Sequence, residues 1–261
     1  MRTKFVRDLS VDEYELYRRH AAIIRKFSKD HELFRLVVRA FEAYERFMKN
    51  AVEAVRSNAE LNQEALVDYS FEPGALILEF LNTSRIFVDH FRLKIIRAFG
   101  ECSAELTSHV DLLGSEFDKY FSYRLLYKLR NYTTHCGLPL LHFQLKRVPG
   151  EHASLIVTME PGELLDSFDG WGKIVRGDLE SHKNDLYVLP LLRENVGSIH
   201  YIFHSLYGEL YRDEVLDSLD LRIFGVGLPR NGLCNCGGRA RCPRASSDFG
   251  VCGCSRDEMP H

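Results

Sequence analysis

A phosphate-binding side chain and a proton-transferring side chain lie close together near residue 130. The segment 126–139 reads LYKLRNYTTHCGLP and carries Arg130, Asn131 and His135 just ahead of a Gly and a Pro. An arginine guanidinium binds phosphate through paired hydrogen bonds, and a histidine exchanges protons near neutral pH. Together these groups suit chemistry on a phosphate ester, so the three residues form the candidate catalytic set.

The segment is expected to end a helix over 116–136, opened by a cap at Ser115 and Asp118 and closed by Gly137. At about 100° per residue, Arg130 and His135 point about 140° apart. One helix alone cannot easily aim both groups at one phosphate, whereas two copies around a dyad can. The side chains that share a face with either residue are candidates for substrate binding: Arg124, Tyr127, Lys128 and Thr134.

A structural interpretation of the same residues stays open. An Asn and a His near a helix end often cap carbonyl groups, and Arg130 is equally suited to an ion pair between helices.

The spacing from Arg to His does not single out this pair. Six other pairs have four to six residues between Arg and His: Arg25–His31, Arg85–His90, Arg147–His152, Arg176–His182, Arg193–His200 and Arg256–His261. The pair Arg130–His135 differs because Asn131 gives the form R-N-x-x-x-H, and because it ends the fourth long helix expected in the chain. With the flanking text LRNY and HCGLP, it resembles the HEPN superfamily of helical-bundle proteins over roughly residues 10–139.

The resemblance implies a metal-independent endoribonuclease in which a homodimer forms a composite active site. Arg130 would hold the phosphate, and His135 would take the proton of a ribose 2′-OH or protonate the leaving 5′-oxygen. Asn131 would orient the imidazole or bind phosphate. Such proteins are commonly toxins or phage-defence effectors, so RNA and an antitoxin are the implied partners, with no cofactor. The alternative is a non-catalytic interaction module, such as a HEPN-like partner of a nucleotidyltransferase.

The pattern of apolar residues predicts a mainly α fold: a HEPN-like bundle at 1–139, a β-hairpin with a helical extension at 140–228, and a tail at 229–261. The first two helices, 10–28 and 30–56, are expected to be antiparallel neighbours, the first opened by a Ser10–Glu13 capping box. The remaining expected elements are a loop at 57–72, a helix from Pro73 to Phe99, a short helix or bend at 103–113, strands at 140–148 and 154–160, a short helix and turn at 162–173, and helices at 190–211 and 212–224.

A polar stripe runs along the helix that begins at Pro73. Glu79, Asn82 and Arg85 recur every third residue on an otherwise apolar helix. They are candidates for a second layer facing the helix of Arg130, because buried polar groups need partners. The alternative is a solvated stripe of weak ion pairs.

The tail contains a cluster of cysteines. Four thiolates suffice for tetrahedral zinc, although the usual C-x2-C spacing is absent. The candidate ligands are Cys234, Cys236, Cys252 and Cys254. This leaves two alternatives: a solvated tail, or a zinc-stabilised nucleic-acid binder.

Composition limits which classes of function are open to the chain. The chain has 261 residues, 45% hydrophobic and 27% charged, with a net charge of −3. These values are ordinary for a globular protein, and they require any nucleic-acid affinity to come from a local patch. No apolar run approaches a membrane span and no secretory signal is visible at residues 1–10, so a cytoplasmic location is expected.

Overall fold

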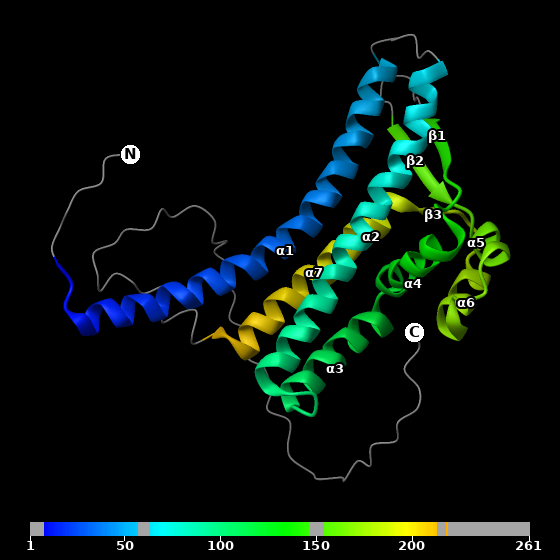
Figure 1. Cartoon of the computed structure of the whole chain (residues 1–261). Helices are drawn as coiled ribbons and strands as arrows, with labels where there is room; N and C mark the ends of the chain where they lie inside the picture. Colours follow the sequence, from blue (N-terminus) through cyan, green and yellow to red (C-terminus); the bar gives the residue numbers. More distant parts are fainter. Residues whose placement is uncertain (1–7, 57–62, 147–153, 213–217, 219–261) are drawn as a thin grey trace, which may run out of the picture.

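The computed structural model describes residues 8–56, 63–146, 154–212 and 218. Within these ranges it is mainly helical, with seven helices and one three-stranded antiparallel sheet (Figure 1). The expectation of a mainly α fold with a β-hairpin is confirmed at this level.

Helix α1, Val11–Arg56, is one continuous helix, and its N-terminal end extends away from the rest of the molecule (Figure 1). The capping box is confirmed: the backbone N–H of Ser10 donates to Glu13 Oε2 at 2.9 Å, and that of Glu13 donates to Ser10 Oγ at 3.2 Å. The expected break at residues 28–30 is wrong, and with it the antiparallel pair of short helices.

The physical reason lies at Asp30, which sequence pattern places at a helix start. Its side chain is buried and bonded to His90, Lys94 and Tyr207. Because these tertiary partners satisfy the carboxylate, it does not need to cap a helix, and α1 continues through the position.

Helix α2, Gln63–Phe99, begins ten residues before the predicted start and contains Pro73 in its interior. A proline inside a helix costs about 3 kcal/mol, so packing must offset it here. Pro73 and Gly74 are buried, and a Cβ on Gly74 would lie only 3.0 Å from Leu138 Cδ1. Thus the helix start at Pro73 is wrong, and so is the predicted loop at residues 63–72, whereas residues 57–62 lie outside the described residues. The predicted stop at Gly100, with φ 97°, is confirmed.

Helices α3, Ala104–Lys119, and α4, Phe121–Cys136, meet at Tyr120. Ser103 caps α3 by accepting from the backbone N–H of Leu106, whereas Ser115 donates to a carbonyl inside α3. The predicted cap at Ser115 and Asp118 is therefore wrong, and α4 starts five residues later than expected. Its predicted end at Gly137, with φ 88°, is confirmed.

The rest of the described chain forms the sheet and three further helices. Strand β1, His142–Lys146, pairs antiparallel with β2, Ser154–Met159, which confirms the hairpin, and β2 pairs with the short β3, Leu186–Tyr187. The helices are α5, Pro161–Ser167, α6, Gly172–Ser181, and α7, Val188–Leu210. Helix α6 and strand β3 were not predicted, and the expected helix at 212–224 and tail at 229–261 lie almost entirely outside the described residues.

A single hydrophobic cluster joins the N-terminal helices to the later elements. Phe34 on α1 stacks on Phe203 of α7 with ring centres 5.0 Å apart. Tyr132 on α4 stacks on Trp171, which is fully buried, with ring centres 5.7 Å apart. The described residues of the predicted segments 1–139 and 140–228 therefore share one core.

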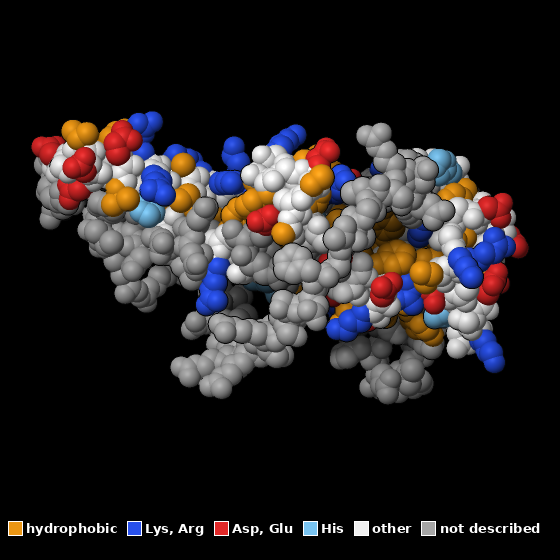
Figure 2. Space-filling model, turned by 90° about the horizontal axis from the view of Figure 1, so that it is seen from below, with side chains coloured by type: hydrophobic (Ala, Val, Ile, Leu, Met, Phe, Trp, Pro, Cys, Tyr) orange, Lys and Arg blue, Asp and Glu red, His pale blue; other side chains and the backbone are white. Residues whose placement is uncertain are grey.

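The described surface mixes both signs of charge. On the face in Figure 2, Lys and Arg side chains alternate with Asp and Glu rather than forming one continuous basic surface. No helix in the described ranges is both long enough and apolar enough to cross a bilayer.

Candidate functional site

Helix α4 holds Arg130 against a small cavity between α2, α4 and α7. The cavity measures about 30 Å³, enough for about two water molecules. Arg130 and Tyr127 line it from α4, Ser84 and Arg85 from α2, and Asn195 from α7. None of its lining residues in the described chain carries a carboxylate.

The polar groups at this cavity have unused hydrogen-bonding capacity. Arg130 Nε, Ser84 Oγ and Asn195 Oδ1 are buried and have no hydrogen-bond partner among the described residues. Arg85, in contrast, donates from Nε to Asp89 Oδ2 at 2.8 Å. Because Arg85 is already paired, the uncompensated positive charge at the cavity belongs to Arg130, which suits a bound anion.

His135 lies in different surroundings, at the last turn of α4. Its ring is exposed and stacks on Phe168 with ring centres 6.1 Å apart and planes 14° apart. Phe168 in turn packs edge-on against Trp171, so a buried aromatic group supports the platform under the imidazole. Arg130 and His135 of one chain do not contact each other, because they point about 140° apart on the helix.

The other polar residues at the end of α4 divide into two kinds. Asn131 is half-buried, and its side-chain amide makes no hydrogen bond to the described residues. The amide is therefore available for a ligand. Thr133 and Thr134 donate their hydroxyl protons to the carbonyl oxygen of Arg130, at 2.7 and 3.0 Å. Those bonds satisfy the last helical turn, so the structure assigns Thr134 a local structural contact.

The other three substrate-binding candidates are packed into the fold. Arg124 bonds Asp178 of α6 through Nε at 2.5 Å, and its Nη1 donates to the last carbonyls of α3. Lys128 is buried, with Nζ 3.7 Å from where a Cβ on Gly172 would lie. Tyr127 lies under the Arg85 guanidinium, 5.1 Å from the ring centre. Arg124 and Lys128 thus connect α4 to α6.

The polar stripe on α2 is only partly directed inward. Arg85 reaches the cavity of Arg130, but Glu79 and Asn82 are exposed and do not line it. Glu79 and Asn82 are thus solvated, as in the alternative interpretation of the stripe, and α4 covers the α2 face of Ser84 and Arg85. Ser84 and Asn195, which the sequence did not single out, occupy that place.

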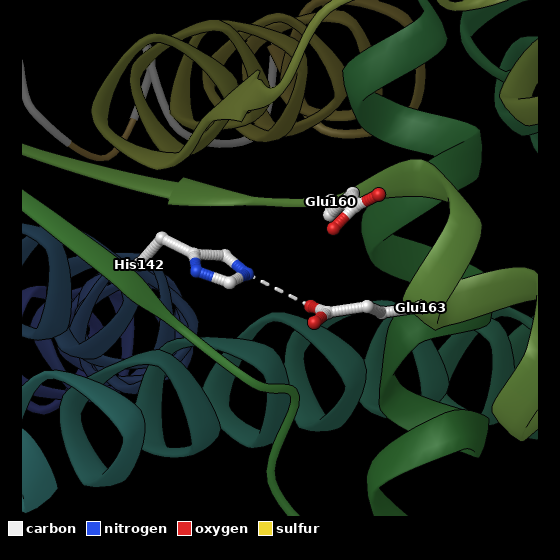
Figure 3. Close-up of side chains that lie close together, drawn as sticks. All are labelled: His142, Glu160 and Glu163. Atoms are coloured by element: carbon white, nitrogen blue, oxygen red, sulfur yellow. Dashed lines mark hydrogen bonds and ion pairs between the residues drawn. The ribbon is translucent and has the colours of Figure 1, made fainter.

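A second group of potential ligands lies at the sheet. The ligand atoms of His142 on β1, Glu160 after β2 and Glu163 on α5 all lie within 4.8 Å of one another (Figure 3). His142 Nε2 is 2.8 Å from Glu163 Oε2; this bond, with the charges of Glu163, Asp185 and Glu160, raises the pKa of His142. Sequence spacing gives no sign of the group, because its members come from separate segments that only the fold brings together.

Two other groups of potential metal ligands do not form a complete site among the described residues. His200 and His204 on α7 have ring centres 4.2 Å apart, but no third ligand joins them in the described part of the chain. The tail cysteines Cys234, Cys236, Cys252 and Cys254 lie outside the described residues.

No protein-family model, curated protein or solved structure matches this chain. The resemblance to HEPN proteins therefore rests on the motif residues Arg130, Asn131 and His135 and on the helical architecture.

Proposed function

We propose that this protein is a metal-independent endoribonuclease that acts as a HEPN-like homodimer, in the manner of toxins and phage-defence effectors. The observation that carries the proposal is the guanidinium of Arg130, which has a buried, unpartnered Nε in a cavity without a carboxylate. A phosphodiester supplies the missing negative charge. Since the cavity admits only water, the RNA phosphate meets Arg130 at its mouth.

The remaining groups fit cleavage by an internal nucleophile. His135, exposed on its aromatic platform, takes the proton of the ribose 2′-OH. The 2′-oxygen then forms a bond to the adjacent phosphorus, and the bond to the 5′-oxygen breaks. The proton held by that imidazole then passes to the leaving 5′-oxygen. The products are a 2′,3′-cyclic phosphate and a 5′-hydroxyl.

Two subunits follow from the separation of Arg130 and His135. In one chain the first faces α2 and α7, whereas the second lies against Phe168. A two-fold axis near the end of α4 would place Arg130 of one chain beside His135 of the other.

Cleavage of RNA by the purified protein in EDTA tests the proposal. His135→Ala and Arg130→Ala should each lower the rate by about 10²–10⁴-fold and abolish cyclic-phosphate ends. The matched controls are Arg193→Ala and His200→Ala, because that pair has a similar spacing and is on α7 outside the cavity. Equal cleavage by wild type and both α4 variants would refute the proposal.

Mixing the two inactive variants tests the composite site. In a mixed dimer of Arg130→Ala and His135→Ala chains, one site holds both substitutions and the other holds neither. Random pairing makes half of the dimers mixed, so activity should return to about a quarter of wild type. A mixture as inactive as its components would show that each site lies within one chain.

One observation favours the alternative of a non-catalytic interaction module. The cavity of about 30 Å³ is too small for a nucleotide, so Arg130 is also suited to receive a carboxylate from a protein partner, such as a nucleotidyltransferase. That function predicts no RNA cleavage by folded wild type, and loss of partner binding in Arg130→Ala but not in Arg193→Ala.

A further inference from the structure

We propose that His142, Glu160 and Glu163 form a binding site for a divalent transition-metal cation, separate from the proposed RNA site. One imidazole and two carboxylates converge there from three places in the chain: β1, the junction after β2, and α5 (Figure 3). Imidazole nitrogen and carboxylate oxygen are the mixed ligand set that cations such as Mn²⁺ and Zn²⁺ accept.

The distances need only small side-chain movements. The three ligand atoms lie within 4.8 Å of one another, and ligands on a cation with bonds of about 2.1 Å lie roughly 3.0–3.4 Å apart. His142 and Glu160 are exposed and Glu163 is half-exposed. Their side chains can therefore close around an ion without moving the backbone.

The backbone that carries them is held in place. His142 pairs with Thr158 across the β1–β2 ladder. Helix α5 is anchored on both sides of Glu163, because Pro161 and Leu164 are buried and the Trp171 indole N–H donates to the Leu164 carbonyl at 3.0 Å. Such support is what a preorganised ligand set requires.

Charge favours a cation over a simple ion pair. The hydrogen bond between His142 and Glu163 uses one carboxylate. The Glu160 carboxylate also points into the group (Figure 3) and has no hydrogen bond or ion pair with any described residue. Asp185 is fixed nearby, since its Oδ2 accepts from Thr158 Oγ1 at 3.0 Å. Three carboxylates around one imidazole leave an excess of negative charge that a dication neutralises.

The expected role of the ion is structural. It would tie β1 to α5, where His142 and Glu163 are already hydrogen-bonded. The site is at the opposite end of α5 from Phe168, which carries the His135 platform. Metal-independent RNA cleavage and a structural cation are therefore compatible, and the two proposals stand or fall separately.

Manganese is the best probe. Zinc also binds thiolates, and the chain has seven cysteines, whereas Mn²⁺ prefers oxygen and nitrogen ligands. The full-length protein is freed of metal with a chelator and titrated with Mn²⁺ while the electron paramagnetic resonance signal of free Mn²⁺ is recorded. We expect saturable binding of one ion per chain, with ¹⁴N coupling from one imidazole in the pulsed spectrum.

The variants separate this site from adventitious binding. Glu160→Gln and Glu163→Gln should each weaken Mn²⁺ binding at least about tenfold, and His142→Gln should remove the ¹⁴N coupling. Glu180→Gln and His200→Gln, both exposed and outside the group, serve as matched controls and should bind like wild type. Because the three ligands are exposed or half-exposed, circular dichroism should show all variants folded.

Three results would overturn the proposal. They are no saturable Mn²⁺ binding by wild type, binding without ¹⁴N coupling, and equal binding by Glu160→Gln, Glu163→Gln and wild type. Any of these would leave His142 and Glu163 as an ion pair only.

Discussion

Asp30 connects the three long helices, and its removal should destabilise the protein more than any surface charge. The carboxylate is 4% exposed. It accepts hydrogen bonds from His90 at 3.2 Å, from the Lys94 ammonium and from the Tyr207 hydroxyl. These bonds join α1 to α2 and α7, and burial followed by the Asp30 bond raises the pKa of Tyr207 far above its usual range.

The expected magnitude follows from burial. Removing one partner of a buried ion pair costs about 3–5 kcal/mol, because the remaining charge loses the compensation that this partner gave in a dry environment. Lys94 is only 11% exposed at its side chain. Asp30→Asn keeps the side-chain shape and one acceptor oxygen, so we expect it to lower the free energy of unfolding by about 3 kcal/mol, the lower end of this range. For a chain of this size that is a fall in Tm of roughly 6–12 °C.

Urea unfolding followed by helical circular dichroism measures this loss. The matched control is Glu180→Gln, which removes an exposed carboxylate 3.0 Å from Arg176, and it should change the free energy of unfolding by less than about 0.5 kcal/mol. If Asp30→Asn came within about 1 kcal/mol of wild type, the network would contribute little, and the continuity of α1 would need another cause.

Four further substitutions, at three residues, test the surroundings of α4. His109 is 1% exposed, and neither ring nitrogen has a hydrogen-bond partner in the described part of the chain. Burial, aided by Arg92, lowers its pKa to about 4. On acidification the unfolded chain therefore binds the proton before the folded chain does. The His109 contribution to the free energy of unfolding is full above about pH 6.5 and falls by about 2 kcal/mol at pH 5. His109→Leu should remove this pH-dependent loss, as measured by urea unfolding at both pH values. Trp171→Ala should lower the free energy of unfolding by about 3–5 kcal/mol. Trp171→Phe should lower it by about 1–2 kcal/mol, because the indole hydrogen bond is lost. Thermal melts measure both effects. Arg124→Met should lower stability by about 1–3 kcal/mol while leaving RNA affinity per folded molecule unchanged in filter binding.

Periodicity and caps predicted those parts of the fold that depend on neighbours in sequence. The capping box at Ser10, the stops at Gly100 and Gly137 and the two-stranded hairpin all appear in the structure. The errors at Asp30 and Pro73 share a cause. Both residues are local signals for a helix start, and both are overridden by contacts from elements distant in sequence, which no short-range rule contains.

The candidate site shows the same division. Arg130, Asn131 and His135 are adjacent in sequence, so a motif can reveal them. Ser84 and Asn195 meet Arg130 only because α2 and α7 pack on α4, and neither lies in a recognisable pattern. Helical periodicity also could not determine which side of α2 faces α4, and so it could not decide between the two interpretations of Glu79 and Asn82.

The later segment of the chain contributes directly to the surroundings of the candidate catalytic residues. Asn195 closes the cavity beside Arg130, and Phe168 supports the ring of His135 while Trp171 holds Phe168 and Tyr132. A protein ending at residue 139 would keep the motif but lose both supports, and it would also lose the packing of α4 against α6 and α7. The first 139 residues alone therefore do not make the site, and the elements after residue 140 are part of what positions Arg130 and His135.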